Sequence, residues 1–461
     1  MQRYKFYLRE NIFYFCNFLE LFMVFRFFIF IILMIFSFGL SAQTDTNRRF
    51  FNYHFQETII SQYHPIFSSL YSGENSLQSN AETATSYSTT LFLGFKLWKN
   101  GSFYFNPELS GGTGFSSTRG VAGFPNGEVY RVSDPLPHIF IARLYYRQLF
   151  SLSDKYEQQT DDANQLPVKV PEKYISLTIG KFSLLDFFDN NYYSHDPRTQ
   201  FFNWALMGNG AWDYPANTRG YNYGFTTEYI TPNFALRYAF VMMPVTANGS
   251  VMDQNILKAN GQALEAEKNY TIGTKKGNIH LLGFFNMANM GNYKEAILWG
   301  KKNDTIPIIT KTRLTGRTKF GYGINVSQEL GKNIGMFFRS SWNDGRNETW
   351  AFTEIDHSAS LGFVIDGKLW KRNEDNIGIA FLINGLSEDH KNYLKAGGYG
   401  FIIGDENLNY APEMIAEFMY LFKLKKYPLQ ITPDYQFVIN PAYNKDRGPV
   451  HVFGARVHIA M

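Results

Sequence analysis

The sequence predicts an all-β fold, a transmembrane antiparallel β-barrel of 16 strands with short periplasmic turns and long extracellular loops. Three observations lead to this prediction. Most of the chain alternates apolar and polar residues with a period of two, and short and long connections follow one another in turn. The composition is also rich in aromatic residues but poor in charge.

The composition excludes several other classes of protein. Only 18% of the 461 residues are charged, below the usual quarter, whereas 18% are aromatic, which excludes disordered and coiled-coil proteins. The single cysteine, Cys16, excludes disulfide-stapled and zinc-ribbon folds. Only one long apolar run occurs, which excludes a helical membrane bundle. A formal net charge of +4 gives no electrostatic footprint for nucleic acid.

The apolar run lies at the start of the chain, over residues 27–40, after Arg26 and before a small-residue exit. This pattern predicts a secretory signal peptide over residues 1–42, because a membrane anchor needs about 20 apolar residues. Residues 1–22 are open to interpretation as an upstream extension. The β-barrel domain is then expected over residues 43–461.

The alternation is clearest over residues 317–330, where one face is polar and the other is aromatic and aliphatic. The polar positions include Arg317, Lys319, Asn325, Ser327 and Glu329, and the apolar positions include Phe320, Tyr322, Ile324, Val326 and Leu330. Residues 138–150 likewise oppose Arg143, Tyr145 and Arg147 to Phe140, Ala142 and Leu144. Each face predicts a different environment, one aqueous and one apolar.

Segments of this kind recur along the chain, and strands of about ten residues suit a tilted crossing of a bilayer. In order, the predicted strands span residues 50–62, 86–98, 101–110, 138–150, 173–183, 222–230, 233–243, 267–274, 278–287, 317–330, 334–342, 357–368, 375–384, 411–422, 429–439 and 450–461.

The connections between these strands alternate in length. Tight ones at 99–101, 231–232, 275–277 and 331–333 hold Gly, Pro or Asn, as reversals require, and long ones span 63–85, 111–137, 184–221, 244–266, 288–316 and 385–410. This alternation is typical of an outer-membrane barrel. Two features fit it poorly: residues 151–172 are long and polar where a short turn is expected, and Pro433 cannot donate to a strand ladder.

A soluble sandwich also alternates, so the apolar face decides between the two folds. That face is rich in Phe, Tyr and Leu and carries hardly a charge. A lipid-facing wall explains this, because a charge at the bilayer midplane of a barrel costs about 2–4 kcal/mol. Lipid offers the backbone no hydrogen-bond partners, so the sheet is expected to close on itself.

The sequence holds no catalytic signature. A phosphate-binding G-x-x-x-x-G-K-[ST] loop, H-E-x-x-H and G-x-S-x-G are all missing from it, so we expect neither an enzyme nor a cofactor. His195 and Asp196, with Asp189, could suggest a metal site. A structural loop role is favoured, because hard-ion sites need several convergent oxygens, and no metal is expected.

The connection at 184–221 is the most distinctive stretch. It carries many aromatic residues, which would be costly to leave in water. Either it packs on itself or under neighbouring loops, or it folds into the barrel and narrows the passage; we favour the second interpretation. The candidate constriction residues are Asp186, Asp189, Asn190, Arg198, Trp204 and Trp212.

The sequence resembles the carbohydrate-selective porins of the OprB-like group. The resemblance lies in 62–65 (QYHP) with 71–77, 105–109 (FNPEL) with 120–127, 180–182 (GKF) with 186–189 (DFFD), 410–417, 434–436 (DYQ) and 440–443 (NPAY). It covers most of the predicted barrel domain in the right order. It implies a sixteen-stranded barrel in the outer membrane of a Gram-negative bacterium, through which small neutral carbohydrates pass by diffusion.

The resemblance also suggests which residues line the passage. These candidates lie on the polar face of predicted strands and comprise Glu108, Arg143, Arg147, Arg317, Glu413, Glu417, Asp434, Gln436 and Arg456. Arginine donors and carboxylate acceptors together would replace the water contacts of a sugar; alternatively, they form salt bridges that stiffen the wall. The alternative function is a general or ion-selective porin without sugar preference. The expected partners are carbohydrates, outer-membrane lipid and further copies of the chain, and not nucleic acid.

Overall fold

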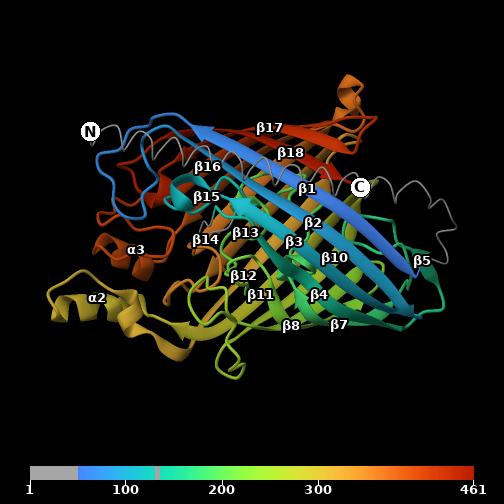
Figure 1. Cartoon of the computed structure of the whole chain (residues 1–461), viewed down its shortest axis with the longest axis horizontal. Coiled ribbons are helices and arrows are strands. Elements are labelled where there is room, and N and C mark those ends of the chain that lie inside the picture. Colours follow the sequence, from blue (N-terminus) through green and yellow to red (C-terminus); the bar gives the residue numbers. More distant parts are fainter. Residues whose placement is uncertain (1–49, 130–134) are drawn as a thin grey trace, which may run out of the picture. The chain divides into compact units, whose positions relative to one another are not determined.

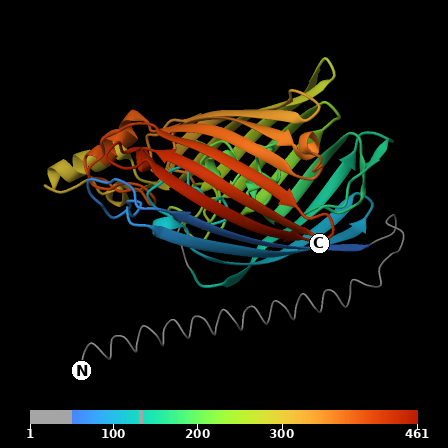
Figure 2. The same ribbon diagram turned by 90° about the horizontal axis from the view of Figure 1, so that it is seen from above.

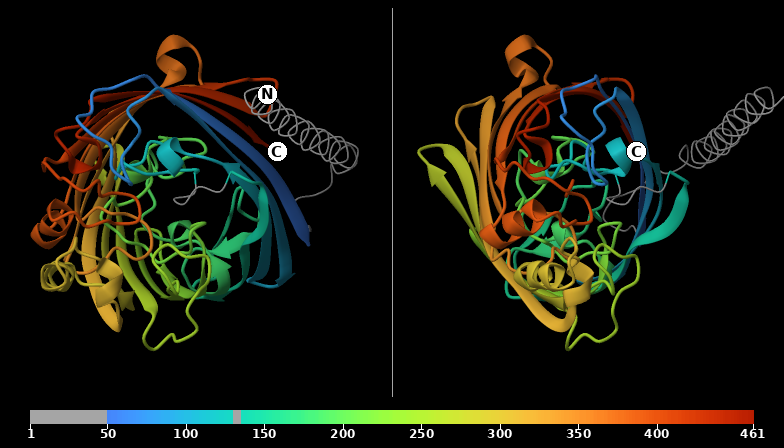
Figure 3. Two further views of the ribbon diagram at one scale, coloured as in Figure 1. Left: turned by 60° about the vertical axis from the view of Figure 1, so that its left-hand side comes forward. Right: turned by 90° about the vertical axis from the view of Figure 1, so that its left-hand side faces the viewer.

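The structure is a computed structural model, and it describes residues 50–129 and 135–461. Sixteen strands of this described part form a closed antiparallel barrel in which β1 (Phe51–His64) pairs with β18 (Val450–Ala460) (Figures 1 and 3). The predicted fold class is therefore confirmed. The predicted signal peptide lies outside the described residues.

The remaining barrel strands follow in chain order. They are β2 (Glu82–Trp98), β3 (Gly101–Gly112), β4 (His138–Ser151), β7 (Tyr174–Phe182), β8 (Asn222–Ile230), β9 (Phe234–Met242), β10 (Asn260–Ile272), β11 (Lys275–Met290), β12 (Leu314–Glu329), β13 (Ile334–Asn343), β14 (His357–Asp366), β15 (Asn376–Gly385), β16 (Glu413–Lys423) and β17 (Leu429–Ile439). Short 3₁₀ helices lie in the connections: η2 (Phe115–Ser117), η3 (Leu184–Asp186), η4 (Trp204–Leu206), η5 (Ile309–Thr312), η6 (Gly367–Trp370) and η7 (Pro441–Tyr443).

The alternation of side chains separates the inside of the barrel from its outside. On β12, Lys319 and Asn325 are 0% and 1% exposed, whereas Phe320 and Tyr322 are 45% and 60% exposed. Successive side chains of a strand point to opposite faces, so the polar set lies within the barrel and the aromatic set covers its outer wall. This is the arrangement that the pattern over residues 317–330 predicts.

The two ends of the barrel differ. At one end, here called the loop end, lie the helices α2 (Tyr293–Lys302) and α3 (Glu388–Lys395), which pack through Tyr293 stacked on His390 at 4.3 Å between ring centroids. At the other, the turn end, lies β5 (Tyr156–Gln158) (Figures 1 and 2). In the ranges that the structure describes, neither α-helix is long and apolar enough to cross a bilayer.

One strand boundary differs clearly from the prediction. β10 begins at Asn260 instead of residue 267, so the preceding connection is shorter than expected. The pattern missed this part because Leu264 is the only large apolar residue among the outward positions 262, 264 and 266. Pairing with β9 and β11 on both sides holds these residues in the sheet.

Two prolines lie within barrel strands, and the register of the ladder shifts beside one of them. The register between β3 and β4 shifts between Asn106 and Pro107, so that Phe140 turns toward the inside, where its ring lies 6.1 Å from that of Tyr221. The predicted apolar-face position of Phe140 is therefore corrected, because proline cannot donate to the ladder and the strand bulges beside it. Pro433 stays in β17 and pairs with β18, and it faces outward.

Residues 151–172 also depart from the short-turn pattern. They include a two-stranded sheet of β5 and β6 (Lys169–Pro171), which extends the connection between β4 and β7 at the turn end.

Candidate functional site

A long connection enters the barrel through its side wall. β7 ends at Phe182, and its residue Lys181 pairs with Leu144 in the middle of β4. β8 resumes at Asn222, directly opposite Phe182. Residues 183–221, here called the inward segment, therefore leave the wall at mid-height and fill much of the interior (Figure 3).

Asp189 is a buried anchor of the inward segment. Its carboxylate accepts hydrogen bonds from the main chain and side chain of Asn209 at 2.5 and 2.9 Å, and from Asn325 at 2.7 Å. Arg339 on β13 lies 3.3 Å from the same carboxylate and donates to the main-chain oxygens of Leu206 and Ser194. Both charges are buried, so each satisfies the other.

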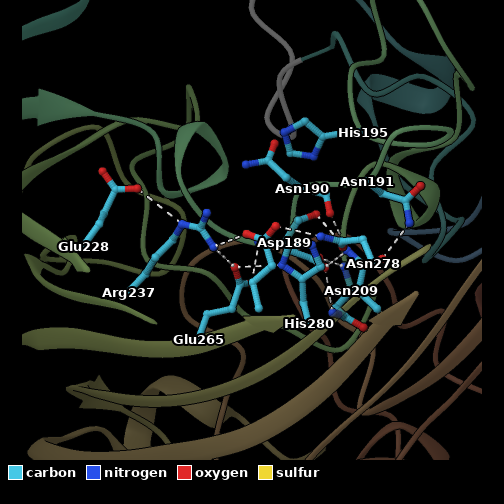
Figure 4. Close-up of polar contacts among 12 residues, drawn as sticks. Asp189, Asn190, Asn191, His195, Asn209, Glu228, Arg237, Glu265, Asn278 and His280 are labelled. Carbon is cyan, nitrogen blue, oxygen red and sulfur yellow. Dashed lines mark hydrogen bonds and ion pairs between the residues drawn. The ribbon is translucent and has the colours of Figure 1, made fainter. Parts of the chain in front are cut away.

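Charged side chains of alternating sign on the neighbouring strands hold Asp189 in place (Figure 4). Arg237 lies between Glu228 and Glu265, at 3.3 and 3.1 Å, and Glu265 accepts the main-chain N–H of Asp189 at 2.7 Å. His280 completes the row with a 3.0 Å contact to Glu265. Strands β8 to β11 thus hold the inward segment through a continuous polar network.

The opposite wall holds the next part of the inward segment. Glu417 on β16 accepts the main-chain N–H groups of Phe202 and Asn203 at 2.6 and 3.0 Å. Arg456 on β18 donates to the main-chain oxygens of Pro197 and Gln200, both at 2.7 Å. These two charged side chains satisfy backbone groups that a buried, irregular segment would otherwise leave unpaired.

The connection before β4 also folds inward. Glu413 accepts from the main chain of Ala122 and Gly123 at 2.9 and 2.6 Å, and Gln436 donates to Pro125 at 2.8 Å and to its neighbour Asp434 at 3.0 Å. Four of the predicted lining residues therefore hold these two inner segments directly: Glu413, Glu417, Gln436 and Arg456. Asp434 contributes through its neighbour Gln436.

Aromatic packing fixes the last part of the inward segment. Trp204 and Trp212 are 2% and 1% exposed, and the ring of Trp204 lies 4.2 Å from that of Phe352. Asp213 accepts three main-chain N–H groups of residues 350–352 at 2.7–2.9 Å. The aromatic content of the segment thus forms an inner core, as the cost of exposing it to water would predict.

A cavity of about 280 Å³, here called the upper cavity, lies between the inward segment and strands β1 to β4. Its charged lining consists of Arg143, Arg198, Arg219, Glu108, Glu128, Asp186 and Asp196, and its uncharged lining includes Asn164, Asn190, Tyr214, Tyr221 and Phe352. Polar groups of both signs therefore surround an opening that also offers aromatic faces.

Arg143 and Asp186 form a forked ion pair across the cavity, with N–O distances of 2.8 and 2.5 Å. Asp186 lies at the end of η3, where it also accepts the main-chain N–H of Ser183 at 3.0 Å, so the pair links β4 to the inward segment. Among the described residues, Nη1 of Arg143 has no hydrogen-bond partner. That nitrogen is buried, so it does not face the open part of the cavity.

Arg198 forms the second charged cluster. It donates to Glu128 at 2.9 Å, to Thr90 at 2.9 Å and to Glu108 at 3.1 Å. Burial raises the pKa of Glu128, although Arg198 opposes this change. Burial also works against the charge of Arg198, but Glu128 and Glu108 raise its pKa well above the usual value. The arginine therefore stays charged while Glu128 gains a proton more readily than a free glutamate.

A second opening of about 210 Å³, here called the lower cavity, lies nearer the turn end. Arg147 lines it together with Glu228, with which it forms an ion pair at 2.7 Å. Arg143, Asp186 and Asn190 line both cavities. The two openings thus follow one another along the barrel.

The site residues predicted from the sequence lie in different parts of the structure. Glu108, Arg143, Asp186, Asn190 and Arg198 line the upper cavity, and Arg147 lines the lower one. Arg317 lies elsewhere, in an ion pair with Glu295 of α2. Asp189, His195 and Asp196 are not gathered as metal ligands in the part of the chain that the structure describes.

Several lining residues escaped the sequence reasoning, among them Arg219, Tyr221 and Asn164. Arg219 and Tyr221 stand in the aromatic-rich connection that the sequence singled out, so their residue types could have identified them. Asn164 stands in a polar stretch expected to be a turn, and the sequence carried no signal for it.

Comparisons with known proteins agree on the fold and family. A family model described as "Carbohydrate-selective porin, OprB family" matches residues 74–461. OprB of Pseudomonas putida, in its high-pH structure, is similar with a TM-score of 0.67 and 15% identity over 89% of this chain and 94% of that chain.

Two relatives of known sequence are similar over a shorter range. Porin AaxA of Chlamydia abortus is 21% identical over 313 residues, which is 66% of this chain and 58% of the relative. Porin AaxA of Chlamydia felis is 21% identical over 313 residues, 66% of this chain and 59% of the relative. The match thus spans less than two thirds of either relative.

Proposed function

This chain belongs to the OprB family of carbohydrate-selective porins, and on that premise we propose that it is a passive channel for small neutral sugars. The family and the fold indicate a channel rather than an enzyme, and they point to a bacterial outer membrane. We further propose that residues 1–42 direct export in a Gram-negative cell and that copies of the chain associate there.

The observation that carries the proposal is the charge balance of the upper cavity. Three arginines face four carboxylates, and Arg143 is paired with Asp186 while Arg198 is paired with Glu108 and Glu128. A balanced lining attracts neither cations nor anions strongly, whereas an ion-selective channel is built from rings of one sign.

The same lining suits a neutral, hydroxyl-rich solute. The arginine side chains and the amide of Asn190 supply donors, the carboxylates supply acceptors, and the ring of Phe352 offers a surface for the C–H face of a sugar. Each lost water contact then has a replacement of similar strength, which keeps binding weak enough for release. The volume of about 280 Å³ suits one sugar ring rather than a chain of rings.

Liposome swelling with the purified full chain tests this function. Glucose is expected to enter rapidly, longer maltooligosaccharides slowly, and reversal potentials in a potassium chloride gradient are expected to lie close to zero. Exclusion of glucose together with strong selectivity for one ion sign would overturn the sugar channel and favour an ion-selective porin.

A further inference from the structure

The connection between β4 and β7 is far longer than a strand reversal requires. Residues 152–173, here called the turn-side insert, lie at the turn end, where β10 and β11 are joined by residues 273–274 alone. β5 and β6 form its base, with Tyr156 opposite Pro171 and Gln158 opposite Lys169. The length of the insert therefore serves something other than reversal of the chain.

The tip of the insert, residues 159–168, turns back toward the inside of the barrel. Asp161 accepts hydrogen bonds from Asn52 at 2.6 Å and from His54 at 2.8 Å, and both of these residues lie on β1. Side chains at even positions of β1 face the interior, as the burial of Asn52 and Gln56 shows. The anchor at Asp161 therefore holds the tip within the barrel mouth.

An apolar contact also holds the tip against the inner face of β2. Leu166 is 2% exposed, and a β-carbon added at Gly94 of β2 would lie 2.6 Å from Cδ2 of Leu166. A larger residue at position 94 would displace the leucine side chain, so the glycine leaves room for it. The tip therefore contacts both β1 and β2.

The tip supplies neutral amides to the passage. Asn164 accepts from Asn106 on β3 at 3.2 Å, and it lines both the upper and the lower cavity. Gln159 and Gln165 line the lower cavity. A solute that passes the ion pair of Arg143 and Asp186 therefore meets carboxamide groups next.

We propose that the tip of the turn-side insert is a second selective element of the channel, a collar whose amides contact the sugar below the charged constriction. This inference rests on the proposed function for the identity of the solute. Amides donate and accept hydrogen bonds without favouring either ion sign, so they select for hydroxyl-rich solutes and limit solute size. Asn164 contributes at both cavities and is the principal specificity residue of the collar.

Cysteine modification in the full chain tests the position of the collar. In a Cys16→Ser background, Asn164→Cys treated with a bulky methanethiosulfonate reagent is expected to lose about half or more of its potassium chloride current, because the label occupies the passage. Gln158→Cys, on the exposed base of the insert, is the matched control and is expected to keep its current. Unchanged current in labelled Asn164→Cys would overturn the collar.

Shortening the insert tests its selectivity. Replacement of residues 153–172 by Asn-Gly is expected to raise conductance about twofold or more and to admit longer oligosaccharides, since the lower cavity loses one side. If this variant fails to assemble, Asn164→Ala with Gln158→Ala as control measures the same loss of size selection. Failure of the proposed function would appear as exclusion of glucose by the unmodified chain. Failure of the collar would appear as glucose uptake whose size limit neither variant changes.

Discussion

Removal of the Asp189 carboxylate provides the strongest test of how the inward segment is held. In the Asp189→Ala variant, Arg339 loses its buried counter-ion, and two asparagines lose an acceptor at 2.7–2.9 Å. Removing one partner of a buried ion pair costs about 3–5 kcal/mol. Arg339 keeps its bonds to main-chain oxygens of Leu206 and Ser194, so we expect the lower end, about 3 kcal/mol.

The free energy of unfolding can be measured with urea in lipid vesicles, followed by tryptophan fluorescence. Trp204 and Trp212 report on the inward segment, since both are buried within it. Asp304→Asn, an exposed aspartate outside the barrel, is the matched control and is expected to leave the urea midpoint unchanged.

A double-mutant cycle separates the ion pair from other losses around Asp189. Asp189→Ala, Arg339→Met and their combination are expected to give a coupling energy of about 1–3 kcal/mol, as for residues in one hydrogen-bond network. A loss below about 1 kcal/mol in Asp189→Ala, or additive single effects, would refute the role of this pair in seating the segment.

Three further outcomes are expected. As pH falls, Glu128 takes up a proton before a free glutamate would, because burial raises its pKa. The lining then loses a negative charge, so reversal potentials should shift toward anion preference. Glu128→Gln should abolish this shift. Arg143→Ala removes charge-assisted hydrogen-bond donors worth about 1.5–3 kcal/mol, so the sugar concentration that half-blocks the current should rise about tenfold or more. Ion selectivity should also shift toward cations. An unchanged half-blocking concentration would contradict contact between Arg143 and the solute. Mass spectrometry of protein from isolated outer membranes should find a chain that starts after Ala42, whereas retention of residues 27–40 would contradict cleavage.

The predicted lining residues show why a strand pattern identifies a face but not a role. Glu417 and Arg456 occupy inward positions, as the alternation predicts, yet the structure gives their hydrogen bonds to the main chain of the inward segment. Parity along a strand depends only on local geometry. What an inward side chain meets depends on connections from other parts of the chain, which alternation does not encode.

The sequence by itself determined the closed barrel. The alternation of apolar and polar residues along each strand specifies which side faces lipid and which side faces polar surroundings. It also marked residues 184–221 as a segment too aromatic to remain in water. Only the tertiary structure decided that Arg143, Arg198 and Asn164 meet around one passage. These residues come from a strand, the inward segment and the turn-side insert. Contacts between residues far apart in the chain bring them together, such as Asp189 with Arg339 and Leu166 with Gly94.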